Sequence, residues 1–144
     1  MKRHATAIWK GALADGTGAI TTQSGALKDQ GYSFKARFQD ESGKSGTNPE
    51  ELLAAAHAGC FAMQLSHFLA ENGTPATELK ATAAVNVEQV SEGFEIKGSA
   101  ITLEAKVPGV DPQTFDDLAN KAKAGCPVSK ALGAITVTLD AKLV

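Results

Sequence analysis

The feature that most constrains this fold is a long apolar segment in the middle of the chain, TNPEELLAAAHAGCFAMQLSHFLAENGTP. Asn48 can cap a helix there, Pro49 suits the first helical position, and Glu51 completes a capping box. Asn72-Gly73 ends the helical pattern. Large apolar side chains occur on almost every side of this helix and are separated mainly by alanines. We therefore predict a helix that runs through the centre of the structure.

A membrane span over Leu52 to Ala70 is the main alternative for this segment. Its length barely suffices to cross a bilayer. Polar side chains also interrupt it, at His57, Gln64, Ser66 and His67. Because polar groups inside a membrane are costly, we predict that the helix does not span one.

The small residues of the same helix favour close helix packing instead. The run Ala54 to Ala56, followed by Ala58 and Gly59, leaves little bulk. Another helix, or the same helix of a partner chain, can then approach closely. A homodimer built around this helix is the resulting hypothesis.

Alternating and β-branched stretches predict strands on both sides of the helix. A hairpin is expected between His4 and Ser24, with its turn at ADGTG, and a third strand from Tyr32 to Phe38, with Arg37 near its end. A second hairpin is expected from Lys80 to Val107. The final stretch, AITVTLDAKLV, predicts a closing strand.

A second helix follows the second hairpin. Asp111 can cap it, Pro112 occupies its first turn, and it closes near Gly125. Pro127, directly after Cys126, begins a short helical turn. Hairpins rather than alternating βαβ units connect the strands, so the predicted class is α+β, with antiparallel sheets and segregated helices. At 144 residues the chain is expected to form one domain, residues 1–144.

Composition excludes several functional classes. The formal net charge is −2 and the pI is near 5.9, so no basic surplus is available to bind nucleic acid or an anionic membrane surface. The start, MKRHATAIWKGALADG, has no continuous apolar run and does not resemble a secretory signal. We therefore expect a cytoplasmic protein whose two cysteines are thiols unless chemistry oxidises them.

Cys60 lies about three turns into the long helix, beyond the reach of the helix dipole. A buried cysteine in such a place usually behaves as a small apolar residue with a raised pKa. His57 precedes Cys60 by three residues and shares its helix face, so an imidazole partner is one option. A packed histidine with no chemical role is the other.

Cys126 has a different local setting. A Cys-Pro pair at the start of a helical turn places the sulfur near unpaired backbone amides, which favours the thiolate. Local physics therefore ranks Cys126 as the more acidic thiol, although a simple capping role explains the same pattern. If the two thiols meet in space, they can cycle between dithiol and disulfide. Sequence alone leaves that open.

Metal and nucleotide sites have little support. The inventory for zinc is two cysteines and three histidines, namely Cys60, Cys126, His57, His67 and His4. They include no Cys-x-x-Cys pair and no second pair at finger spacing. The glycine-rich ADGTG segment lacks the lysine of a phosphate loop. We expect neither a metal nor a cofactor.

Three segments resemble the OsmC branch of the OsmC/Ohr family of organic hydroperoxide reductases. They are FKARF, GTNPEELLAAAHAGCFAMQLS and KAKAGCPVSKAL, in this order and at compatible spacing. The resemblance extends over nearly the whole chain. The Ohr branch carries its arginine in a Gly-Gly-Arg stretch near the amino terminus, whereas this chain has GALADG there and Arg37 in FKARF. That difference favours the OsmC branch.

The resemblance implies an intertwined α+β homodimer with its central helices packed together and active sites at the subunit interface. It also implies catalytic roles. Cys60 attacks the peroxide, Arg37 stabilises its thiolate and the leaving oxygen, and Glu50 orients Arg37. A guanidinium stays charged and can fork between a carboxylate and a sulfur or oxygen, which fits that role.

The implied cycle passes through a Cys60 sulfenic acid, which condenses with Cys126 to a disulfide. A dithiol reductant, of the lipoyl type by resemblance, then resets the pair. Apolar neighbours of Cys60, including Phe61 and Leu53, are expected to favour organic hydroperoxides over hydrogen peroxide. Two alternatives are a cysteine hydrolase in which His57 deprotonates Cys60, and a non-catalytic dimer with structural thiols.

Overall fold

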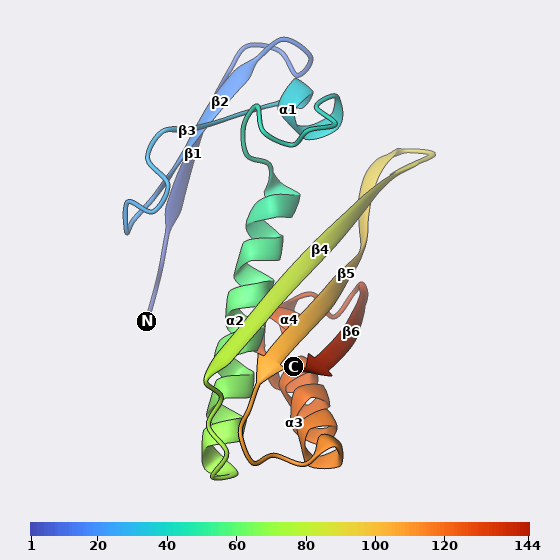
Figure 1. The fold of residues 1–144 in the computed structure, drawn as a ribbon. Coiled ribbons are helices and arrows are strands. Elements are labelled where there is room, and N and C mark those ends of the chain that lie inside the picture. Colours follow the sequence, from blue (N-terminus) through green and yellow to red (C-terminus); the bar gives the residue numbers. More distant parts are fainter. The chain divides into compact units, whose positions relative to one another are not determined.

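The computed structural model describes residues 1–144 and contains six strands and four helices (Figure 1). The chain forms two compact units, Met1–Pro49 and Glu50–Val144. The expectation of a single domain over 1–144 is not tested by this division, and each unit is described separately below.

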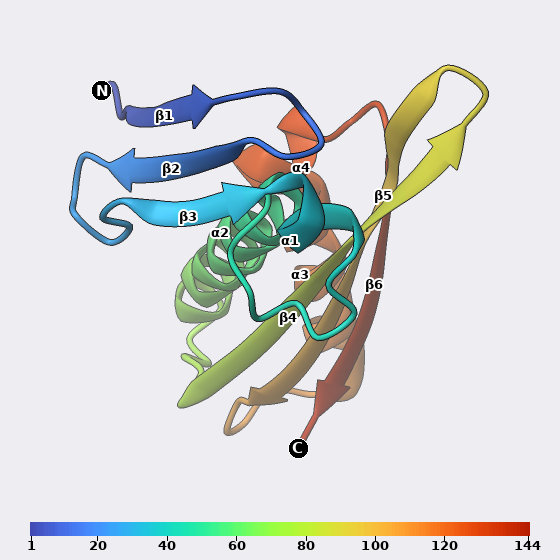
Figure 2. The ribbon, with the colours of Figure 1, turned by 90° about the horizontal axis from the view of Figure 1, so that it is seen from above.

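The first unit contains a three-stranded antiparallel sheet in the order β1-β2-β3. Its strands are β1 (Ala5–Lys10), β2 (Thr17–Thr22) and β3 (Gln30–Ser33). Figure 2 shows the three strands side by side. The predicted hairpin between His4 and Ser24 is therefore confirmed.

The strand predicted from Tyr32 to Phe38 is wrong beyond Ser33. The hydroxyl of Ser33 accepts a hydrogen bond from the Ala36 amide at 3.0 Å and caps a short helix, α1 (Phe34–Phe38). The alternation of aromatic and basic residues suggested a strand, but the serine side chain offers the backbone a helical start instead. Arg37 consequently lies on α1 and not at a strand end.

The second unit contains the two long helices and a second sheet. Its elements are α2 (Pro49–Glu71), which starts at the last residue of the first unit, β4 (Glu78–Val90), β5 (Gly93–Lys106), α3 (Pro112–Gly125), α4 (Pro127–Ala131) and β6 (Thr136–Leu143). All of these elements were predicted at closely similar bounds. Asp111 caps α3 as expected, since its carboxylate accepts a hydrogen bond from the Thr114 amide at 2.9 Å.

The second sheet has the order β4-β5-β6 and differs in one pairing from the expected antiparallel pattern. β4 and β5 form the predicted antiparallel hairpin. β6 pairs parallel with β5, from Gly98 opposite Thr136 to Ala105 opposite Leu143. A parallel neighbour needs a crossover connection, which α3 and α4 supply. The α+β class holds, with one mixed sheet.

The core of the second unit lies between α2, β5 and α3. Alternate residues of β5 turn one face inward, where Ile101, Leu103 and Ala105 are buried. Phe61 from α2 and Phe115 from α3 pack in the same cluster. The other face of this hairpin carries exposed ion pairs such as Lys80 with Glu104, so helices cover one side of the sheet only.

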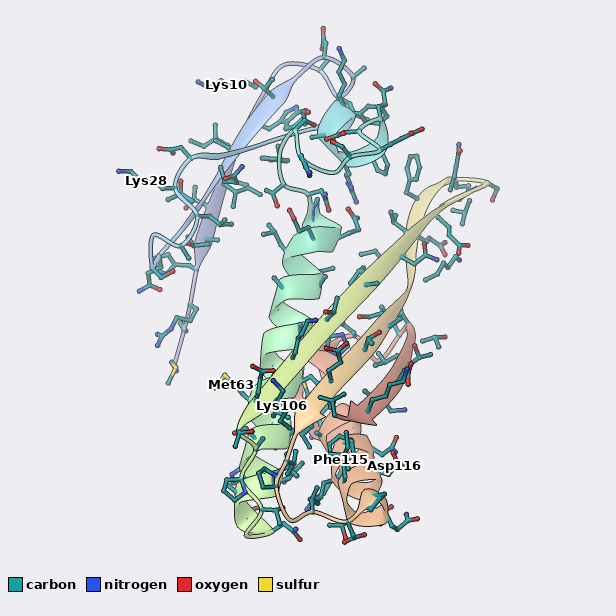
Figure 3. All side chains as sticks on the ribbon, in the orientation of Figure 1. Lys10, Lys28, Met63, Lys106, Phe115 and Asp116 are labelled. Carbon is teal, nitrogen blue, oxygen red and sulfur yellow. The ribbon has the colours of Figure 1, made fainter.

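Helix α2 is buried on one face only, contrary to the prediction that it runs through the centre. Its buried residues are Glu50, His57, Phe61, Leu65 and Leu69. Met63 projects from the opposite face and is 77% exposed (Figure 3). By length and composition alone α2 could cross a membrane, with a mean hydropathy of 1.3 over its most apolar window. The apolar sequence of α2 predicts burial on all sides, but within one chain the face that carries Met63 is exposed.

Candidate functional site

The two cysteines meet in the second unit. Cys60 lies on α2, and Cys126 lies at the junction of α3 and α4, where its amide closes α3 on the Ala122 carbonyl. Their sulfur atoms are 2.8 Å apart, and both are free thiols. Cys126 has no exposed surface, whereas Cys60 is partly exposed. A small movement would therefore allow a disulfide to form between them.

The two thiols differ in acidity. Burial and the hydrogen bond with Cys126 raise the pKa of Cys60. Burial also acts to raise the pKa of Cys126, but its hydrogen bonds with Cys60, with the amide and hydroxyl of Ser129 and with the Val128 amide together lower it below its ordinary value. This is the order that the local physics of the sequence predicted. No cationic group is among the causes that act on Cys60.

His57 is fully buried beside the thiol pair and binds two serines. Its Nδ1 lies 2.7 Å from the Ser99 hydroxyl on β5, and its Nε2 lies 2.7 Å from the Ser129 hydroxyl on α4. Burial lowers the pKa of His57 and favours the neutral ring. Both ring nitrogens thus contact hydroxyl groups rather than a thiol, which gives no support to a hydrolase in which His57 deprotonates Cys60.

Cys60 lines an open cavity of about 280 Å³ with Met63, Gln64, His67 and Pro127. Phe61, which the sequence suggested as a neighbour of the substrate, is not part of it. Its side chain is fully buried in the core. The sequence reasoning treated adjacency along a helix as adjacency in space, whereas successive helical residues point about 100° apart.

Arg37 lies in the first unit at an aromatic cavity of about 310 Å³. The cavity is lined by Trp9, Leu13, Tyr32, Ser33, Phe34, Arg37, Phe38 and Pro49. The guanidinium carbon of Arg37 is 4.7 Å from the centre of the Phe38 ring, a cation–π distance. Phe34 and Phe38 also contact each other, with ring centres 5.1 Å apart. This cavity combines one fixed positive charge with apolar walls.

A glycine allows two of these aromatic rings to meet. Gly18 on β2 pairs with Trp9 on one side and with Tyr32 on the other. A Cβ atom on Gly18 would lie 2.3 Å from the Tyr32 ring. Without it, the rings of Trp9 and Tyr32 contact each other at 5.3 Å between centres. The aromatic wall thus depends on a position with no side chain.

Glu50 lies in the first turn of α2 and is 7% exposed. It belongs to the second unit, whereas Arg37 belongs to the first. The structure therefore brings together Cys60 and Cys126, and it places Arg37 at a cavity of its own unit. The expected contacts of Arg37 with Glu50 and with a thiolate stay predictions.

Sequence reasoning missed Ser99 and Ser129, the two partners of His57. Ser129 carried a weak signal. It follows Cys126 by three residues at the start of a helical turn, where a side chain can form a hydrogen bond back to the residue that caps the helix. Ser99 carried none. It is an inward-facing residue of β5 whose polarity becomes informative only when the buried ring beside it is known.

Comparison with known proteins identifies the family. The family model described as "OsmC-like protein" matches residues 41–140. The chain is 48% identical over 137 residues to peroxiredoxin OsmC of Escherichia coli (strain K12), which covers 95% of this chain and 93% of that protein. It is 32% identical over 127 residues to the organic hydroperoxide resistance protein OhrB of Bacillus subtilis (strain 168), covering 87% and 89%.

Solved structures agree with this assignment. The crystal structure of OhrB of Bacillus subtilis aligns with a TM-score of 0.70 at 30% identity, covering 96% of this chain and 98% of that one. An organic hydroperoxide resistance protein OsmC from Legionella pneumophila aligns with a TM-score of 0.75 at 26% identity, covering 96% of both chains. The paired thiols thus lie in a known fold, and the chain belongs to the OsmC-like family.

Proposed function

We propose that this protein is a thiol peroxidase that reduces organic hydroperoxides to alcohols. The observation that carries the proposal is the contact of the two thiols, at 2.8 Å across 66 positions of sequence. Two free cysteines placed together in a small domain form a dithiol that can be oxidised and reset. The relatives support the chemistry, since they include a peroxiredoxin and organic hydroperoxide resistance proteins.

The reaction takes two steps. The Cys60 thiolate attacks the terminal peroxide oxygen, the O–O bond breaks, and the alkoxide leaves and takes up a proton as the alcohol. Cys126 then attacks the Cys60 sulfenic acid and forms the disulfide with loss of water. A dithiol reductant restores both thiols by exchange, and the family resemblance suggests one of the lipoyl type.

Arg37 supplies the charge that the second unit does not give to Cys60. Burial and Cys126 raise the pKa of Cys60, and no cation counters them within that unit. A guanidinium from the same chain or from a partner would lower this pKa and stabilise the leaving oxygen. Glu50 would orient the guanidinium through a two-pronged contact.

The aromatic cavity at Arg37 supports the proposal that organic hydroperoxides are the preferred substrates. Its walls include Trp9, Tyr32, Phe34 and Phe38. Burying an alkyl or aryl group there gains roughly 25 cal/mol per Å² of apolar surface, a gain that hydrogen peroxide cannot obtain. Organic hydroperoxides are therefore expected to react with a higher kcat/KM than hydrogen peroxide.

A homodimer is part of the same proposal. The exposed stripe of α2 consists mainly of small or apolar residues, namely Ala55, Ala56, Gly59, Met63, Ser66 and Ala70. Packing two such stripes together would remove them from water at close interhelical distance. We place the protein in the cytoplasm, where reductants are available to reset the disulfide.

The test is an intact-mass and thiol titration of the reduced protein before and after slightly more than one equivalent of an organic hydroperoxide. We expect loss of both thiols without cross-linking between chains, and a trappable sulfenic acid in Cys126→Ser. Arg37→Ala should slow Cys60 oxidation at least a hundredfold, by about 2.7 kcal/mol. Lys35→Ala, which removes a neighbouring exposed charge of α1, is the control. Thiols that survive the hydroperoxide unchanged would exclude the peroxidase function.

A further inference from the structure

The buried polar groups beside the thiol pair form one continuous chain. The ring of His57 lies 2.7 Å from the hydroxyls of Ser99 and Ser129, and the sulfur atoms of Cys126 and Cys60 are 2.8 Å apart. Ser129 follows Cys126 by three residues on α4, and it is among the hydrogen-bonding groups that lower the pKa of Cys126. Three separate elements supply it, since Ser99 lies on β5, Ser129 on α4 and His57 on α2. No buried side-chain nitrogen or oxygen atom lacks a hydrogen-bond partner.

Hydrogen counting allows two directions of donation along this chain. The Ser129 hydroxyl has one hydrogen, and it can donate that hydrogen either to Nε2 of His57 or to the sulfur of Cys126. If it donates to the sulfur, Nε2 must carry the ring hydrogen and donate to the Ser129 oxygen. Nδ1 of the neutral ring is then an acceptor, and the Ser99 hydroxyl donates to it. One tautomer of His57 thus directs the Ser129 hydrogen at Cys126.

Resting on the proposed function, we propose that His57 is a positioning residue for the second chemical step. By donating from Nε2 to Ser129, it holds the serine hydroxyl in the orientation that stabilises a Cys126 thiolate. Ser129 acts directly on the reacting sulfur, and Ser99 sets the tautomer of the ring. None of these three residues takes part in the attack of Cys60 on the peroxide.

We call the groups Ser99, His57 and Ser129 the relay. The chemical step that the relay assists is the condensation of the sulfenic acid with Cys126. The Cys126 thiolate attacks the Cys60 sulfur, the S–S bond forms and the S–O bond breaks. The oxygen leaves as water, with the sulfenic hydrogen and the proton that Cys126 had given up. Formally one electron passes from the Cys126 sulfur to the Cys60 sulfur, so no further reactant is needed.

Burial explains why such a relay is needed. Cys126 has no exposed surface, and a charged sulfur without water must obtain its hydrogen bonds from the protein. The titratable groups of the network are His57, Cys60 and Cys126. The lowered pKa of His57 keeps its ring neutral. The relay therefore stabilises the Cys126 thiolate through the hydrogen bond of Ser129 and not through a positive charge on the ring.

The experiment measures the acidity of Cys126 by thiolate absorbance against pH in a Cys60→Ser background. Ser129→Ala and His57→Leu should each raise the Cys126 midpoint by about one unit, a tenfold loss of thiolate at neutral pH. His57→Gln should shift it less, because the Gln amide can still donate to Ser129. Thr138→Ala, which removes an exposed hydroxyl of β6, should leave the midpoint unchanged.

Rapid-quench measurement of sulfenic acid decay with Cys60 present provides the second readout. A one-unit rise in the pKa removes about ninety per cent of the thiolate, but the more basic thiolate is also more nucleophilic, so condensation should slow about threefold. Unchanged Cys126 midpoints and decay rates in folded Ser129→Ala would overturn the assignment. If His57→Leu does not fold, Ser129→Ala and His57→Gln still decide the result.

The outcome is separable from that of the proposed function. Oxidation of Cys60 by hydroperoxide is followed in the Cys126→Ser background with and without Ser129→Ala, and the two rates should agree. If hydroperoxide fails to oxidise Cys60 at all, the peroxidase proposal fails, while the titration of Cys126 still tests the relay.

Discussion

The sulfur atoms of Cys60 and Cys126 are 2.8 Å apart, yet only one of them can be reached from outside the second unit. Cys60 is partly exposed and lines an open cavity with Pro127 and Met63. Cys126 has no exposed surface. When the two are joined in a disulfide, an incoming thiol has access to the Cys60 sulfur alone.

We therefore predict that the reductant attacks Cys60 and releases Cys126. The lowered pKa of Cys126 makes it the better leaving group, which acts in the same direction as access. Oxidised protein treated briefly with a small monothiol, quenched in acid and mapped by mass spectrometry should carry the mixed disulfide on Cys60. A mixed disulfide found mainly on Cys126 would contradict this assignment.

Gly18→Ala should damage the aromatic cavity. The new Cβ would lie 2.3 Å from the Tyr32 ring, so Tyr32 must move away from Trp9. We expect a loss of roughly 1–3 kcal/mol in the free energy of unfolding, typical of overpacking. The kcat/KM for a bulky aryl hydroperoxide should also fall more than that for hydrogen peroxide.

Gly31→Ala is the matched control for this substitution. Gly31 lies on the neighbouring strand β3, and a Cβ atom there meets no atom within 4 Å. Urea unfolding and peroxide kinetics of the two variants should therefore differ. Equal effects would show that loss of any sheet glycine, and not the Tyr32 contact, is responsible.

The physical limits of sequence reasoning are visible in the first unit. The β1–β2 hairpin was predictable, because a turn cluster separates two β-branched stretches. The helix at Arg37 was not, since the period-2 pattern of YSFKARF outweighed a single capping hydroxyl at Ser33. The role of Gly18 was also invisible, because it depends on rings from two other strands that meet across it.

Met63→Glu should weaken the proposed dimer. Met63 is 77% exposed on the apolar stripe of α2, and a charge buried there between two helices would be costly. We expect the dimer dissociation constant to rise at least a hundredfold, measured by sedimentation at several concentrations. Thr82→Glu, on the exposed face of β4, should leave it unchanged. A wild-type protein that sediments as a monomer would remove the premise.

The buried ring of His57 should make stability depend on pH. Burial lowers its pKa from the ordinary 6.5, so just below that pH the unfolded chain binds a proton that the folded protein does not. The buried neutral ring of His57 makes its full contribution to the free energy of unfolding above pH 6.5. This contribution is lost as the pH falls toward the pKa of His57 in the folded protein.

Urea unfolding from about pH 7 to about pH 5.5 provides the measurement, a range that isolates histidine from most carboxylates. The free energy of unfolding of the wild type should fall with decreasing pH by up to about 1.4 kcal/mol per unit more than that of His57→Gln. Parallel curves for the two proteins would show that His57 does not titrate differently on folding.

Much of the candidate site was within reach of the sequence, but its assembly was not. The residue types at Cys60, Cys126 and His57 were identifiable, and the Cys-Pro turn ranked the acidities in the order found. What no pattern could supply was the contact across 66 positions or the pairing of His57 with two serines from other elements. Such contacts depend on tertiary packing, which no periodic pattern of the sequence reveals.

The parallel pairing of β6 with β5 has a consequence for biosynthesis. The β4–β5 hairpin can form as soon as it leaves the ribosome, but β6 must wait until α3 and α4 have been made. Cys126 emerges 66 residues after Cys60, so while those residues are being made the nascent chain carries a single thiol with no internal partner. The redox pair therefore comes into existence only after α3 has been made.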